Sequence, residues 1–209
     1  MPTTVRSVSE AADRMYERAR RAADADGRLG LPSYVEWDVF PFEGDLKVRP
    51  LDPPVLPEPP RVGEDGDDCP SCERGDSGVL WSDERWVLVP LDEPNGLPAL
   101  VMLETREHLD LPDLSDELAA EFGRLTVSLV KVMKGLDGVA NVHVSRWGDG
   151  GAHLHVFFYA RPAGFSQLRG TVLALWDDIL PATPRDEWDT NLRLIARGLS
   201  AAHGGRAHV

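Results

Sequence analysis

Short apolar runs alternate with turn-forming residues in the second half of the chain. The runs at 86–89 and 100–103 are rich in Val and Leu and predict two strands, with turn residues at Asn95-Gly96 between them. Two further runs, at 139–147 and 153–159, predict two more strands, which a glycine-rich segment at 148–151 joins. These four runs predict a small sheet.

Three stretches of this half have helical periodicity. Ser115 is a favourable N-cap, and the apolar residues after it recur on one face of a helix that ends near Gly135. After Pro162 the pattern predicts a helix over 165–180 and another from Thr183, with Pro184 at its first position. Strands and helices together predict the α+β class, an antiparallel sheet with a long packed helix and C-terminal helices.

Residues 1–66 differ from the rest. Ser7 to Glu10 has the spacing of a capping box and opens an Ala- and Arg-rich helix that is expected to end near Gly27 or Gly30. Residues 33–48 are predicted to be extended, and the proline-rich segment 50–60 a polyproline-type connector. We therefore expect an N-terminal arm at 1–66 and a main domain at 67–209. The arm packs either on its own domain or on a partner.

Composition narrows the functional classes. Of the 209 residues, 42% are hydrophobic, which suffices for a core, and the formal net charge is −13. Such a surface repels a phosphate backbone, so double-stranded nucleic acid is not an expected partner, although a locally cationic pocket can still bind a small anion. The sequence has no apolar stretch long enough for a transmembrane helix and no secretory signal, so we expect no membrane partner and a cytoplasmic protein.

His153 and His155 alternate with Leu154 and Val156 in the predicted strand 153–159. Side chains alternate between faces of a strand, so this spacing places both imidazoles and Phe157 on one face. An isolated pair of this kind is as often a solvated surface pair as a functional one. The glycines just before it allow a ligand to approach the backbone closely, which favours function.

The two cysteines of the chain form a C-x-x-C motif, Cys69 and Cys72. Thiolates and imidazoles suit a tetrahedral zinc ion, and with His108 and His153 they would make a Cys₂His₂ set drawn from separate parts of one fold. The alternative for the cysteines is a buried or redox pair, and for His108 a residue without a ligand role.

The sequence resembles the histidine-triad (HIT) superfamily over about 69–162. The resemblance rests on the strand run ending in Arg106-Glu107-His108, on the helix after it, and on His153-Leu154-His155-Val156-Phe157, followed by Ala160-Arg161-Pro162. The C-x-x-C motif is similar to the galactose-1-phosphate uridylyltransferase branch. The resemblance implies a HIT-like fold in which Cys69, Cys72, His108 and His153 bind a structural zinc ion. It also implies that His155 is the nucleophile toward the α-phosphorus of a nucleotide. Members of the superfamily often form homodimers, so the resemblance makes a homodimer possible for this chain.

The sequence departs from the family at two positions. Phe157 stands where the family has a third His or a Gln, and Gly150 stands where it has Ser or Thr. Both family residues contact phosphate. Ser145 or Asn141 stands near a polar family position. The candidate substrate-binding residues are Arg146, Gly150, Gly151, Phe157, Arg161, Gln167 and Arg169.

These observations leave three candidate functions. The first is a nucleotide hydrolase or nucleotidyltransferase that forms a nucleotidyl-histidine at His155. The alternative is a zinc-stabilised nucleotide-binding module with weak or no catalysis, which the two departures favour. The third is a partner-binding protein that uses the N-terminal arm.

Overall fold

The computed structural model describes residues 8–209, and its chain divides into two compact units, Met1–Pro59 and Pro60–Val209. Ser7, the first residue of the predicted capping box, lies outside the described residues. Among residues 8–209, no helix is both long and apolar enough to cross a membrane.

The first unit contains the α-helix α1 (Val8–Ala22) and the 3₁₀ turn η1 (Ser33–Glu36). Helix α1 ends before the predicted Gly27. The Asp24 carboxylate accepts hydrogen bonds from the backbone N–H groups of Asp26 and Arg28, both at 2.9 Å, and this local turn competes with helix continuation. The 3₁₀ turn η1 interrupts the segment that was predicted to be extended. No residue from 8 to 59 is buried.

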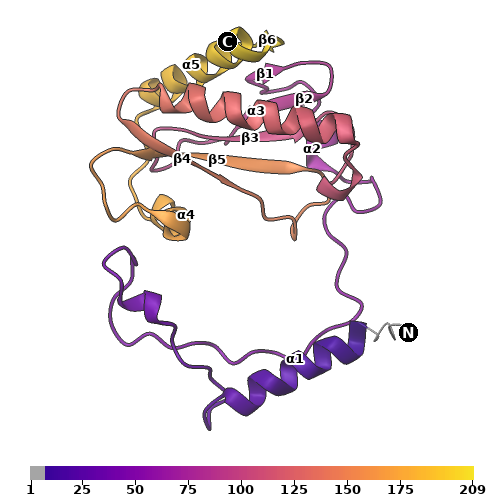
Figure 1. Cartoon of the computed structure of the whole chain (residues 1–209), viewed down its shortest axis with the longest axis vertical. Helices are drawn as coiled ribbons and strands as arrows, with labels where there is room; N and C mark the ends of the chain where they lie inside the picture. Colours follow the sequence, from indigo (N-terminus) through magenta and orange to yellow (C-terminus); the bar gives the residue numbers. More distant parts are fainter. Residues whose placement is uncertain (1–7) are drawn as a thin grey trace. The chain divides into compact units, whose positions relative to one another are not determined.

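The second unit is built on a six-stranded sheet in the order β4-β5-β3-β2-β1-β6, with every neighbouring pair antiparallel (Figure 1). The strands are β1 (Trp81–Ser82), β2 (Trp86–Pro90), β3 (Leu100–Thr105), β4 (Val139–Ser145), β5 (His155–Pro162) and β6 (Arg206–Ala207). The predicted α+β class, with its antiparallel sheet, is confirmed.

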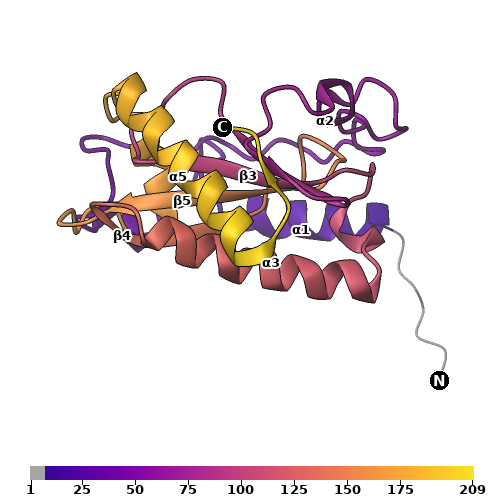
Figure 2. The same ribbon diagram turned by 90° about the horizontal axis from the view of Figure 1, so that it is seen from above.

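Two long helices lie together on one face of the sheet (Figures 1 and 2). They are α3 (Asp116–Lys134) and α5 (Arg185–His203). The Ser115 hydroxyl caps α3 by accepting from the Leu118 N–H at 3.2 Å, as its sequence predicted. Pro184 is the N-cap of α5 rather than its first residue, a difference of one position. Buried leucines of α3 and α5 pack with Trp188 into the core over the sheet.

Short elements occupy the remaining connections of the second unit. They are α2 (Pro70–Arg74), η2 (Leu111–Asp113), η3 (Gly170–Val172) and α4 (Leu173–Asp177). The prediction of a helix over 165–180 was wrong, because only α4 and the turn before it are helical. Gly164 and Gly170 have φ of +85° and +61°, which breaks a right-handed helix on either side of Phe165. Helix α4 lies on the face of the sheet opposite α3 (Figure 1).

The two strands around the glycine-rich segment are displaced from their predicted bounds. Strand β4 ends at Ser145 rather than Trp147, and β5 begins at His155 rather than His153. The chain between them leaves the sheet: the Leu154 N–H donates to the Leu109 carbonyl at 2.7 Å, and Gly151 forms a parallel bridge with Val62. His153 is therefore a loop residue, and its side chain does not follow the alternation between faces that holds within a strand.

Candidate active site and metal centre

The four predicted zinc ligands come together. The Cys69 sulfur lies 3.5 Å from His153 Nδ1, and the Cys72 sulfur lies 3.4 Å from His108 Nδ1 and 3.5 Å from His153 Nδ1. All four donor atoms lie within 4.8 Å of one another. In a tetrahedral zinc site, with Zn–S about 2.3 Å and Zn–N about 2.05 Å, neighbouring sulfur and nitrogen ligands are about 3.6 Å apart. The donor set fits zinc in both chemistry and spacing.

Local structure explains how the cysteines reach this position. Cys69 is the N-cap of α2, Pro70 begins that helix, and Cys72 follows within the first turn, so both sulfurs face the same side. Gly63 crosses directly over the first cysteine: it has φ +75°, and a Cβ placed on it would lie 3.0 Å from the Cys69 Cβ. The segment before α2 is thus fitted closely to the metal centre.

His153 is buried, and its partners fix its tautomer. Its Nε2–H donates to the Thr105 carbonyl at 2.7 Å, and a carbonyl can only accept, so Nδ1 turns its lone pair toward the two sulfurs. Burial lowers the pKa of His153 and keeps the ring neutral. Desolvation and the adjacent Cys69 thiol raise the pKa of Cys72 to about 11, so a metal ion must displace its proton.

His155, the predicted nucleophile, begins β5 and is partly exposed. Its Nδ1–H donates to the His153 carbonyl at 2.8 Å, which leaves the lone pair of a neutral ring on Nε2. The ring is therefore held in the tautomer that a nucleophilic Nε2 requires, by a residue that also belongs to the metal centre. A Cβ on Gly151 would lie 3.7 Å from His155 Cε1, so the glycine backbone passes close to the ring.

A backbone carbonyl faces the reactive nitrogen. The Trp147 oxygen lies 3.1 Å from His155 Nε2, so in this conformation both ring nitrogens face acceptors. A neutral ring that donates from Nδ1 has its lone pair on Nε2, so that lone pair faces the carbonyl oxygen. In this conformation the Trp147 carbonyl therefore lies in the direction of the Nε2 lone pair.

An ion-pair network holds the segment that carries this carbonyl. Arg61 Nη1 donates to Asp110 Oδ2 at 2.7 Å and to the Gly148 carbonyl at 3.0 Å, and Arg146 pairs with the other oxygen of Asp110. Partial burial opposes ionisation of Asp110, but hydrogen bonds from Arg61, the Leu111 backbone and Arg146 lower its pKa, so the carboxylate is charged at neutral pH. Its charge is shared between two guanidinium groups.

The other predicted substrate-binding residues are spread more widely. Gly151 lies beside His155, a Cβ on Gly150 would meet nothing within 4 Å, and the ring of Phe157 meets the His155 ring edge to face at 5.5 Å. Arg161 lies six residues further along β5 and donates to the carbonyls of Pro162 and Phe165, at 3.3 and 3.4 Å. Gln167 and Arg169 are exposed residues of the connection that follows β5. Of the predicted residues, Gly151 and Phe157 contact the His155 ring, and Arg146 pairs with Asp110.

Three residues of the site were not predicted from the sequence: Arg61, Asp110 and Thr105. Asp110 was detectable only as a cap: its side chain and that of Asp113 form a capping box at η2. Nothing in the spacing of Arg61 and Asp110, which are 49 residues apart, indicates that they pair. Thr105 acts through its backbone carbonyl, which no side-chain pattern can reveal.

No protein-family model and no curated protein sequence matches the chain. A Zn-bound histidine triad family protein from Mycobacterium smegmatis is 18% identical, with a TM-score of 0.46, over 64% of this chain and 94% of that chain. A histidine triad protein from Bradyrhizobium japonicum is 15% identical, with a TM-score of 0.47, over 60% and 94%. A uridylyltransferase mutant is 17% identical, with a TM-score of 0.42, over 92% and 70%. The chain's structural neighbours are histidine-triad proteins and uridylyltransferases.

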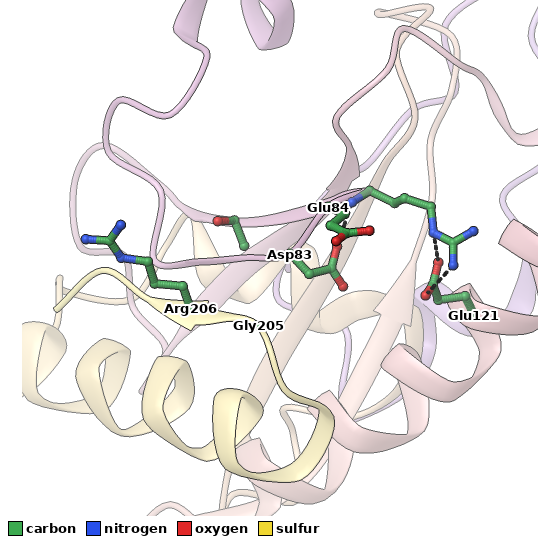
Figure 3. A pocket seen from close by; sticks show the side chains of 7 residues that line it. Asp83, Glu84, Glu121, Gly205 and Arg206 are labelled. Atoms are coloured by element: carbon green, nitrogen blue, oxygen red, sulfur yellow. Dashed lines mark hydrogen bonds and ion pairs between the residues drawn. The ribbon is translucent and has the colours of Figure 1, made fainter.

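A separate hollow of about 480 Å³ lies where β1, β2 and the C-terminal strand meet α3 (Figure 3). Asp83, Glu121 and His203 bring potential metal-binding atoms within 4.8 Å of one another there. The two acids already have partners. Asp83 Oδ1 accepts from the backbone N–H groups of Arg85 and Trp86, and Glu121 pairs with Arg85 at 3.0 Å. The Asp83 contacts form the turn between β1 and β2, the Glu121 pair ties this turn to α3, and we assign the hollow no separate function.

Proposed function

We propose that the protein is a nucleotide hydrolase or nucleotidyltransferase that uses His155 as its nucleophile. The observation that carries the proposal is the hydrogen bond from His155 Nδ1–H to the His153 carbonyl, because it fixes the tautomer that nucleophilic attack by Nε2 requires. The H-x-H motif and the glycine segment beside it support the same chemistry through their resemblance to the histidine-triad superfamily.

The reaction proceeds in two steps. The lone pair of His155 Nε2 forms a bond to the α-phosphorus, and the bond to the leaving group breaks with its electron pair remaining on that group. Water or another acceptor then attacks the phosphorus of the nucleotidyl-histidine, loses a proton, and returns His155 to its starting state. Backbone N–H groups of residues 148–151 and the Arg146 guanidinium are the groups we propose to meet the negative charge on the phosphoryl oxygens.

Cys69, Cys72, His108 and His153 would hold a structural zinc ion, which supplies a rigid cross-link and no reactive position. His153 serves two purposes in this arrangement: its ring binds the metal and its carbonyl orients the nucleophile. His153 is therefore not available as an acid or base.

The proposed function is tested with a set of nucleotide conjugates: adenosine phosphoramidate, dinucleoside polyphosphates and nucleotide sugars. We expect the wild-type protein to cleave at least one of them, His155→Ala to lose the activity, and His203→Ala, which removes a histidine remote from the site, to retain it. Quenched single-turnover mixtures should contain a labelled, acid-labile protein adduct that His155→Ala lacks. Cleavage that is no faster than in His155→Ala, for every substrate, would refute the proposal for these substrates.

Two observations favour the alternative, a zinc-stabilised nucleotide-binding module with weak or no catalysis. Phe157 cannot donate a hydrogen bond to phosphate, and the Trp147 carbonyl faces Nε2 at 3.1 Å. Loss of one charge-stabilising donor typically lowers a rate about 100- to 1,000-fold. Calorimetry that shows tight nucleotide binding in both wild type and His155→Ala, with no turnover in either, would support this alternative. A covalent adduct in a single turnover would exclude it.

A further inference from the structure

A second cavity, of about 260 Å³, lies on the His155 face of the sheet between β4, β5 and α4. Its walls include His143, Ser145, Trp147, Tyr159, Thr171 and Ala174. In the sheet register His143 pairs with Tyr159 and Ser145 with Phe157, so these side chains share the face of His155. Tyr159 follows His155 by four residues, about 13 Å at the usual rise of a strand.

Aromatic rings connect the nucleophile to this cavity without a break. The Phe157 ring lies 5.5 Å from that of His155, 5.7 Å from that of Trp147 and 6.0 Å from that of Tyr159. Trp147 and Tyr159 meet edge to face, at 6.2 Å and 86°. The Trp147 side chain nevertheless remains 50% exposed. The aromatic rings between His155 and the cavity thus include a large solvent-exposed surface, that of Trp147.

One of the residues that line the cavity, His143, has a polar atom without a partner in the described structure. His143 Nε2 is buried and makes no hydrogen bond. Burial, with the charge of Arg161, lowers the pKa of His143, so the ring is neutral. A neutral imidazole in the cavity wall suits an uncharged group better than an anion.

Charge decides what kind of group the cavity suits. No Lys, Arg, Asp or Glu is among the described residues that line it. Burial, with the charges of Asp177 and Asp178, raises the pKa of Tyr159 to about 12, so its hydroxyl is also uncharged. A phosphate chain would find no cation here. The volume lies below the roughly 300–1,000 Å³ typical of pockets for drug-sized molecules, so the cavity suits one ring rather than a whole nucleotide.

We propose that this cavity binds an uncharged, ring-bearing leaving group on the phosphorus that His155 attacks. The proposal rests on the function proposed above and adds a substrate class to it. Phe157 then has a positive role: a ring attached to the phosphorus passes over it, through contacts that a histidine or glutamine would not favour. Leaving groups that consist only of phosphate are poor substrates, because neither Phe157 nor the cavity can pair their charge.

Two substrates that differ only in the ring test the proposal. N-benzyl and N-methyl phosphoramidates of AMP and of UMP share the nucleotide, and both release a primary alkyl amine. Because benzylamine is the weaker base, the change in selectivity between wild type and a cavity variant decides the test. Wild type should prefer the benzyl compounds. Ala174→Leu fills the cavity and should lower kcat/KM for the benzyl compounds about tenfold or more, as burial of a ring predicts, while the methyl compounds change less than about twofold.

Controls separate the cavity from general damage. Leu175→Phe alters an exposed neighbour on α4, and both substrates should retain their kcat/KM within about twofold, as for an ordinary surface change. Ala174→Val is a milder filling variant for use if Ala174→Leu does not fold, and it should produce a smaller loss of the same selectivity. Equal losses on benzyl and methyl compounds, or no preference in wild type, would overturn the proposal.

A binding measurement distinguishes failure of this proposal from failure of the proposed function. In His155→Ala, which cannot form the adduct, the N-benzyl compounds should shift the NMR signals of the His143 ring, and the N-methyl compounds should not. If wild type cleaves neither compound and the His143 signals still shift with the benzyl compounds, the catalytic proposal fails and the cavity site stands. If no His143 signal shifts with either compound, the cavity proposal is wrong, whatever the activity.

Discussion

At the scale of single residues, Arg61 determines where the Trp147–Gly148 segment lies. Its guanidinium joins Asp110 to the Gly148 carbonyl, next to the carbonyl that faces His155 Nε2. Arg61→Met should loosen this segment and lower kcat/KM roughly tenfold, since a displacement of about 1 Å in a catalytic site can cost up to about 100-fold. Arg20→Met, which breaks the exposed Arg20–Glu17 pair on α1, should have no effect. Equal activity in both variants would mean that Arg61 does not position the site.

The four candidate zinc ligands lead to a prediction about metal content. Protein purified without chelators should contain about one zinc ion per chain, and Cys72→Ser should lose it, because a serine hydroxyl is a far weaker ligand than a thiolate. Metal analysis and thermal unfolding measure this, and the zinc-free variant should melt at a lower temperature. Ser71→Ala lies between the two cysteines and should retain the metal. Well-folded wild type without zinc would contradict the assignment.

The residues that sequence could identify are those whose side chains carry the chemistry. The C-x-x-C motif, His108 and the H-x-H motif supplied the four candidate zinc ligands, and the structure brings these four residues together. Sequence could not show that the His153 carbonyl orients His155, that the Trp147 carbonyl faces its Nε2, or that Arg61 reaches Asp110. Backbone groups and long-range ion pairs leave no periodic signal, because any residue type can supply a carbonyl.

At the scale of elements, α4 is held to the β2–β3 loop by a buried acid. Asp177 Oδ2 accepts from Asn95 Nδ2 at 2.9 Å, and burial with the charge of Asp178 raises the pKa of Asp177 to about 6. The unfolded carboxyl titrates near 3.9, so the folded state binds the proton more tightly, and this group's contribution to stability is greatest below pH 4. Between about pH 4 and 6 that contribution should fall by on the order of 1–3 kcal/mol.

Asp177→Asn removes this titration. Its free energy of unfolding, measured by chemical denaturation at several pH values, should vary less between pH 4 and 7 than that of wild type. Asp178→Asn alters the exposed neighbour and should retain most of the wild-type slope. The same pH dependence in wild type and Asp177→Asn would show that the buried carboxyl does not titrate in this range.

The contact between α3 and α5 depends on a glycine. A Cβ on Gly198 of α5 would lie 2.6 Å from Val132 Cγ1 of α3, whereas a Cβ on Gly123, on the exposed side of α3, would meet nothing within 4 Å. Gly198→Ala should destabilise the fold by about 1–3 kcal/mol through overpacking. Gly123→Ala should stabilise it by about 0.5–1 kcal/mol through helix propensity. Denaturant titrations of the two variants measure both signs, and stabilisation by Gly198→Ala would contradict this packing.

Elements with strong hydrophobic periodicity or capping residues could be predicted from the sequence. The ends of elements next to irregular loops could not. Ser115 and Gly135 bounded α3 correctly because capping is local. The strand that contains His155 was predicted to begin two residues too early. The Leu154 N–H donates to the Leu109 carbonyl rather than to the sheet, and the His153 ring contacts the Thr105 carbonyl and the cysteines. The apolar residues of 165–180 suggested one long helix, but Gly170, with a positive φ, interrupts it and Gly164, also with a positive φ, stands just before it.

At the scale of the whole molecule, the two units contribute differently to stability. The second unit contains the sheet and the hydrophobic core, and residues 8–59 contain no buried side chain. Residues 61–63, which the sequence assigned to the N-terminal arm, contact the site of the second unit: Arg61 binds Asp110, Val62 bridges Gly151, and Gly63 packs on Cys69. This short segment links the metal centre to the glycine-rich segment beside His155.

Two truncations show where the functional domain begins. A chain that starts at Pro60 retains residues 61–63 and should keep its zinc and a melting temperature close to that of the full chain. A chain that starts at Asp67 loses two backbone hydrogen bonds, Val62 N–H to the Gly150 carbonyl and Ala152 N–H to the Val62 carbonyl, each 3.0 Å. At about 1 kcal/mol for each bond and roughly 2–4 °C per kcal/mol, it should melt about 4–8 °C lower. It should also bind zinc less tightly, because Gly63 no longer covers Cys69. Equal melting temperatures and zinc contents for the two truncations would show that the segment is dispensable and that the domain begins after it.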